Sequence, residues 1–132
     1  MHHAFRRMLV DTDVLIWNFR GHERAAKRLD DASGFYTSSV TYMELVQGMH
    51  SNAELNAFRQ SIRHWKATVL RGEPQSSTRA IFLLESYALS HGFRVAVALI
   101  AASAMILGPS LLAANAKHLR MIEGLTLSIF KS

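Results

Sequence analysis

The chain of 132 residues contains no cysteine. That absence excludes disulfide bonds, thiolate metal sites and a cysteine nucleophile, so we expect a protein of a reducing compartment, the cytoplasm. Long apolar runs are also missing, because the longest, Val95 to Leu107, is too short for a membrane span. Met1 to Arg7 is polar and basic, so we expect neither a secretory signal nor any membrane association.

Acidic residues are scarce. The chain has 10 Asp and Glu against 15 Lys and Arg, which gives a net charge of +5. An excess of basic side chains suits a surface that binds a polyanion such as nucleic acid, although many small soluble domains are simply basic. The basic residues are spread along the chain, which favours a positive face over a charged tail.

The length and a hydrophobic fraction of 49% predict one globular domain over residues 1–132. Residues 1–7 are interpreted as an N-terminal extension, with Met8 as an alternative first residue. Expected strands alternate with expected helices, which predicts an α/β fold with a parallel sheet covered by helices on both faces. The expected strands are 9–10, 35–37, 67–70, 111–113 and 125–130, and the expected helices are 14–19, 22–31, 40–49, 53–65, 76–90 and 95–107.

An aspartate stands directly behind the first expected strand. Open parallel sheets place their chemistry at the carboxyl ends of the strands, which is where Asp11 falls. A carboxylate at an apolar sheet end is costly unless it is paired or binds a cation. Asp13, two residues later, is interpreted either as the N-cap of the first helix or as a residue that supports a site at Asp11.

A second acid, Glu44, lies about one turn into the helix that follows the second expected strand. Because the first two strands of such a sheet are neighbours, Asp11 and Glu44 can share a cleft. Two close carboxylates repel each other, and a hard divalent cation relieves that repulsion. The alternative for Glu44 is a capping-box partner of Thr41.

Four segments in this order resemble PIN-domain nucleases, with the VapC toxins of bacterial toxin–antitoxin pairs as the most similar branch. The segments are Met8 to Trp17, Ser39 to Gly48, Ala98 to Ala104 and Leu111 to Leu119. The resemblance extends from Met8 to about Phe130 and implies a three-layer α/β/α sandwich with a central parallel sheet of about five strands. It also implies a Mg²⁺- or Mn²⁺-dependent endoribonuclease, a VapB-like antitoxin partner and a homodimer.

The resemblance assigns roles to individual residues. Asp11 corresponds to the first metal ligand, and Glu44 to the second acid of the cluster. Asn115 falls where the family carries Asp or Asn, and would position a metal-bound water, while Thr12 would form a hydrogen bond within the site. His118 is interpreted either as a phosphate contact or as a structural residue.

One position departs from the family pattern. Family members carry an acid where this chain has Val97. A carboxylate about 4 Å from a unit charge contributes roughly 4 kcal/mol at an effective dielectric near 20, and half of that is still more than tenfold in affinity. We therefore expect an impaired metal site. Val97 is either natural in a degenerate member or a substitution that removes toxicity; a third interpretation has Glu85 or Asp13 replace the ligand. The alternative function is a catalytically inactive PIN-like module that binds antitoxin or RNA.

Overall fold

The computed structural model describes residues 7–72, 74–91 and 93–131. Five short strands alternate with six helices along the described chain, as the sequence predicts. Most predicted boundaries agree to within two residues. In chain order the elements are β1 (Leu9–Val10), α1 (Thr12–Phe19), α2 (Glu23–Asp31), β2 (Tyr36–Ser38), α3 (Ser39–Gln47), α4 (Asn52–His64), β3 (Thr68–Leu70), α5 (Pro74–His91), α6 (Val95–Leu107), β4 (Leu111–Ala113) and β5 (Leu127–Ile129).

All five strands are parallel and lie in the order β3-β2-β1-β4-β5. Strand β1 is central, because Val10 is in register with Thr37 of β2 on one side and with Leu112 of β4 on the other. The chain first adds β2 and β3 on one side of β1, and then crosses through α5 and α6 to the other side. The switch point of the sheet, where such folds form their sites, therefore lies between β1 and β4.

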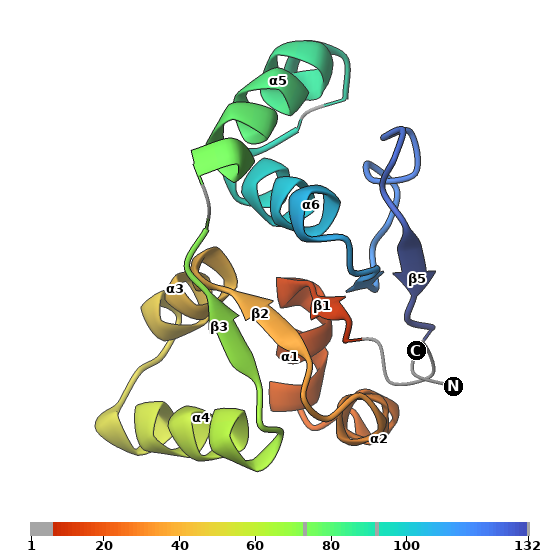
Figure 1. Cartoon of the computed structure of the whole chain (residues 1–132). Coiled ribbons are helices and arrows are strands. Elements are labelled where there is room, and N and C mark those ends of the chain that lie inside the picture. The colour runs from red at the N-terminus through yellow and green to blue at the C-terminus, as the bar shows by residue number, and fades with distance from the viewer. Residues whose placement is uncertain (1–6, 73, 92, 132) are drawn as a thin grey trace.

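Helices cover both faces of this sheet (Figure 1). Alternate residues of β1 point to opposite faces, as strand geometry requires. Leu9 belongs to the core under α5 and α6, and Val10 to the core shared with α1 and α2. The three layers confirm the predicted α/β/α sandwich. None of the described helices is both long and apolar enough to cross a membrane.

The long helix α6 is the most apolar element, and its bounds match the prediction. Ala98, Ile100 and Ala101 are buried there against the sheet. Gly108 ends the helix in the left-handed conformation, with φ of 90°, and its N–H donates to the carbonyl of Ala104 at 2.8 Å. A glycine tolerates this conformation because it has no Cβ. The sequence also predicts a glycine cap at Gly92, behind the helix expected at 76–90, but Gly92 lies outside the described residues.

Some local predictions were wrong. Helix α1 begins at Thr12 with Asp11 as its N-cap, so the N-cap interpretation of Asp13 is wrong. Asn52 directly before the helical pattern at 53–65 predicts an N-cap at that residue, but the structure has Ser51 as the N-cap of α4. Phe58 and Trp65 recur at helical spacing, which predicts core positions for both, and both are buried.

Candidate metal site at the switch point

Asp11 is held at the junction of β1 and α1. Its backbone N–H donates to the carbonyl of Leu112 in β4 (2.8 Å), and its Oδ1 accepts from the N–H of Thr12 (2.8 Å). The residue is only 9% exposed. Burial, with the negative charges of Asp13 and Glu44 adding to it, raises the pKa of Asp11 from its ordinary value of 3.8 to about 7, although the Thr12 hydrogen bond acts in the opposite direction. The fold thus disfavours the charged form of this carboxylate.

The side chain of Glu44, on α3, lies beside Thr12 at the start of α1. Its Oε1 accepts from the Thr12 hydroxyl at 2.9 Å, and that hydroxyl also lies 2.9 Å from the hydroxyl of Thr41. A hydroxyl has one proton, so Thr12 donates it to Glu44 and Thr41 must be the donor to Thr12. The hydrogen bonds therefore run from the buried Thr41 through Thr12 to Glu44. They link α3 to α1 beside Asp11.

The N-terminus of α3 contradicts one of the two interpretations of Glu44, the capping box. Ser38 is the N-cap of α3, and its side chain accepts from the N–H of Val40. Thr41 is already inside the helix, so the interpretation of Thr41 and Glu44 as a capping box is wrong. Thr41 is also the residue of this site that the sequence reasoning missed. Its spacing of three residues from Glu44 places both on one face of α3, which is the signal that could have indicated it.

Asp13 links α1 to the residues that follow β4 through hydrogen bonds. Its Oδ2 accepts from the backbone N–H of Asn115 at 2.7 Å, and both of its oxygens lie within 3.2 Å of the N–H of Ala114. Hydrogen bonds to an ionised carboxylate are roughly twice as strong as neutral ones. Asp13 therefore holds the two sides of the switch point together while its charge raises the pKa of Asp11.

Asn115 follows β4 on the same edge of the sheet, as predicted. Its backbone N–H is bound to Asp13, and its side-chain Oδ1 accepts from the N–H of Lys117 at 3.3 Å. The Asn115 side chain thus stabilises the turn formed by residues 115–117. His118 is exposed, and so is Glu85 in the middle of α5.

Val97 lies in the first turn of α6, half-buried against the core beneath that helix. Helix α6 packs against α3, the helix that carries Glu44, and Val40 of α3 lies against the same core. The N-cap of α6, Arg94, makes no side-chain hydrogen bond to the helix. An acid at position 97 would therefore meet uncapped N–H groups and the positive end of the helix dipole.

The donor set fits a divalent cation only in part. Asp11 and Glu44 offer carboxylate oxygens, the ligands that Mg²⁺ and Mn²⁺ prefer, and the raised pKa of Asp11 shows that its charge lacks compensation. Within residues 7–72, 74–91 and 93–131, however, no three acidic or histidine side chains are grouped closely enough to hold a metal ion. Val97 contributes no oxygen where the helix geometry would favour one.

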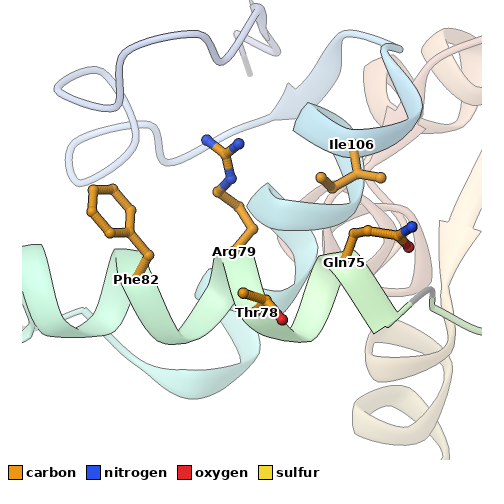
Figure 2. Close-up of a pocket in the computed structure, with 5 residues that line it drawn as sticks. All are labelled: Gln75, Thr78, Arg79, Phe82 and Ile106. Atoms are coloured by element: carbon orange, nitrogen blue, oxygen red, sulfur yellow. The ribbon is translucent and has the colours of Figure 1, made fainter.

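A separate hollow of about 710 Å³ is lined by side chains of α5 and α6 (Figure 2). Arg79 and Phe82 of α5 and Ile106 of α6 line it, and none of its described lining residues is acidic. It does not include any residue of the carboxylate site. The exposed apolar side chains beside it, Phe82 at 59% and Ile81 at 58%, mark a surface of a different kind.

Fold and site together define a parallel α/β domain with acidic side chains at its switch point. The model of the PIN domain matches residues 8–123, and the chain therefore belongs to the PIN domain family. This confirms the family resemblance seen in the sequence. No curated protein is similar enough in sequence to count as a relative.

Several solved structures share the fold. A toxin–antitoxin complex from Klebsiella pneumoniae is 22% identical, with a TM-score of 0.72 and coverage of 90% of this chain and 95% of that one. DNA-bound VapBC from Salmonella typhimurium is 19% identical, with a TM-score of 0.75 and coverage of 94% and 98%. VapBC-1 from nontypeable Haemophilus influenzae is 20% identical, with a TM-score of 0.68 and coverage of 92% and 96%.

Proposed function

We propose that this protein is a divalent-metal-dependent endoribonuclease of the VapC type, the toxin of a toxin–antitoxin pair. One observation carries the proposal: Asp11 is buried at the switch point next to Glu44, with a pKa raised to about 7. Perturbed carboxylates in such a position are typical of functional sites. Membership of the PIN domain family and the toxin–antitoxin complexes among the structures that share the fold support the same assignment.

Each residue has a role in this reaction. Asp11 would hold the cation, and Glu44 would complete its shell or accept the proton of the attacking water. Thr12 orients Glu44 through its hydroxyl, and Asp13 fixes the loop after β4 so that Asn115 can position a water. When bound, the cation activates a water and stabilises the charge that develops on the phosphate. Single-stranded RNA is the expected substrate, because one phosphate must be reached in isolation.

Val97 impairs this site. The missing carboxylate reduces the affinity for a divalent cation by more than tenfold, on the order of 2 kcal/mol. The position itself is suited to an acid, because it lies at the third residue of α6 beside uncapped N–H groups. We therefore expect weak activity in this chain and recovery when the acid is restored.

The test compares Val97→Asp with Val95→Asp. Val95 lies in the same first turn but is 62% exposed, so an acid there gains the same dipole energy without joining the site. Mn²⁺ affinity is measured by calorimetry, and cleavage is measured on a pool of labelled single-stranded RNAs. We expect Val97→Asp to raise Mn²⁺ affinity at least tenfold and to cleave, whereas Val95→Asp behaves as the parent protein.

The second candidate is a PIN-like module that binds antitoxin or RNA without cutting. It is favoured because the described residues contain no group of three side chains that could hold a metal ion. If Val97→Asp still binds no Mn²⁺ and leaves every RNA intact, this second function replaces the first.

Two partners belong to the proposal. The first is a VapB-like antitoxin, in keeping with the VapBC complexes that share the fold. The second is another copy of this chain, for which the exposed Ile81 and Phe82 of α5 offer an apolar surface. Contiguous apolar surface of this kind marks interaction sites.

A further inference from the structure

A second cavity, of about 680 Å³, is lined by three arginines. It lies between α3, α4 and the edge strand β3. Arg59 and Arg63 stand one turn apart on α4, and Arg71 follows β3 directly. Its apolar lining comes from Tyr42 and Met43 of α3, Ile62 of α4 and Val69 of β3.

The positive charge of this cavity is uncompensated. Among the described residues, none of the three guanidinium groups makes an ion pair or a hydrogen bond, and no acidic side chain lines the cavity. Like charges at a spacing of four residues on a helix repel each other, as Arg59 and Arg63 do. An anion in the cavity would remove that repulsion. Guanidinium groups suit phosphate in particular, since they bind two of its oxygens at once.

The cavity lies on the same edge of the sheet as the carboxylate site. Arg71 follows β3 as Asp11 follows β1, with β2 between them, so the two strand ends are about 10 Å apart. Ser39 at the start of α3 borders the cavity, and Glu44 is five residues further along the same helix, a rise of about 7.5 Å. A polyanion that reaches Asp11 therefore passes within a few nucleotides of the three arginines.

We propose that this arginine cavity, Arg59, Arg63 and Arg71, holds a backbone phosphate of single-stranded RNA next to the phosphate that is cleaved. The proposal rests on the proposed ribonuclease function. It also explains how an RNA chain approaches a site of three carboxylates, because the arginines offset on one side the repulsion that Asp11, Asp13 and Glu44 exert on phosphate. An acidic protein segment would find the same charges, but nothing would then place it beside the carboxylates.

The test measures RNA binding without cleavage. Anisotropy of a labelled single-stranded RNA of about twelve nucleotides, long enough to span both sites, is titrated in EDTA at several salt concentrations. The triple variant Arg59→Gln/Arg63→Gln/Arg71→Gln is compared with a control that removes the same charge from the region of α2 and the end of β5, at Arg24, Lys27 and Lys131.

We expect the arginine-cavity variant to bind RNA about 10- to 100-fold more weakly, with a salt slope smaller by about 0.7 for each phosphate that is no longer neutralised. The control should change affinity by less than about threefold. Equal losses in both variants would show a general charge effect and overturn the proposal. Unchanged RNA binding together with weaker binding of an acidic peptide would also overturn it, in favour of a protein partner.

A second arm separates this proposal from the ribonuclease function. The same triple substitution is placed in Val97→Asp, and cleavage is measured with Mn²⁺. Cleavage that survives with unchanged KM overturns the arginine cavity alone. If Val97→Asp never cleaves, yet RNA binding still depends on the three arginines, the cavity stands as an RNA site and the nuclease assignment fails. Thermal unfolding of each variant verifies its fold. Arg→Lys substitutions at the three positions keep the charge but lose the contacts to two oxygens at once, so they should restore only part of the affinity.

Discussion

The substitution Asp11→Asn should make the metal-free protein more stable, even though it removes the central residue of the site. Asparagine keeps the side-chain oxygen that accepts from the N–H of Thr12, so α1 retains its N-cap. What it removes is a buried charge. At pH 7.5 the wild-type Asp11 is largely ionised, in the negative field of Asp13 and Glu44.

The magnitude follows from the pKa of Asp11, which rises from 3.8 in the unfolded chain to about 7 in the fold. Between these values the folded state holds a proton that the unfolded state has released, so stability falls as pH rises, by about 1.4 kcal/mol for each pH unit. From pH 5 to pH 7.5 the wild type should lose on the order of 2.5 kcal/mol that Asp11→Asn does not lose. Local relaxation and water penetration reduce this, and we expect at least about 1 kcal/mol.

Urea unfolding at both pH values, in EDTA, measures the difference. The control is Asp31→Asn, because Asp31 is 59% exposed and pairs with Lys27 at 3.7 Å; its effect should stay within about 0.5 kcal/mol. Parallel stability curves for wild type and Asp11→Asn from pH 5 to pH 7.5 would refute the reasoning. Adding Mg²⁺ at pH 7.5 should then stabilise the wild type and not the variant, because only the wild type presents the carboxylate.

Three further outcomes are expected. Thr37→Val should raise the free energy of unfolding by about 1 kcal/mol because its buried hydroxyl has no partner among the described residues. Thr41→Val should lower the free energy of unfolding by about 1 kcal/mol because the Thr41 hydroxyl donates to Thr12, so urea unfolding of the two variants should show changes of opposite sign. Asp13→Asn should lower stability by about 2 kcal/mol at pH 5 in the same assay, since charge-assisted bonds to the end of β4 are lost, and no change would contradict that role. Phe82→Lys should convert a dimer to a monomer in light scattering, and a dimer that persists would place the interface elsewhere.

The sequence predicted the site where sheet topology alone determines it. Asp11 and Glu44 converge because each follows one of two neighbouring parallel strands, and that neighbourhood can be inferred from the order of the elements. Asn115 arrives on the same edge for the same reason, since β4 pairs with β1. The fold required no correction. The roles that the family motifs give to Asp11 and Glu44 stay predictions.

The hydrogen bonds within the site could not be predicted. The bonds from Thr41 to Thr12 and from Thr12 to Glu44 depend on how α3 packs on α1, and the bonds of Asp13 join residues about a hundred positions apart. Sequence periodicity reports which face of a helix is apolar, and carries no information on which hydroxyl meets which carboxylate. For the same reason Asp13 was interpreted as a cap, although Asp11 serves both as the cap and as the acid of the site.

The raised pKa of Asp11 indicates that Val97 also affects the stability of the metal-free protein. In the proposed site, a carboxylate at position 97 would raise the pKa of Asp11 further and destabilise the fold whenever the cation is absent. Valine at this position instead adds apolar contact with the core under α6. If the proposed function is right, Val97 would thus weaken cation binding and also relieve electrostatic repulsion in the metal-free protein. A degenerate member and a variant selected for loss of toxicity would both retain it for this reason, because neither carries the instability that an active metal site imposes between reaction cycles.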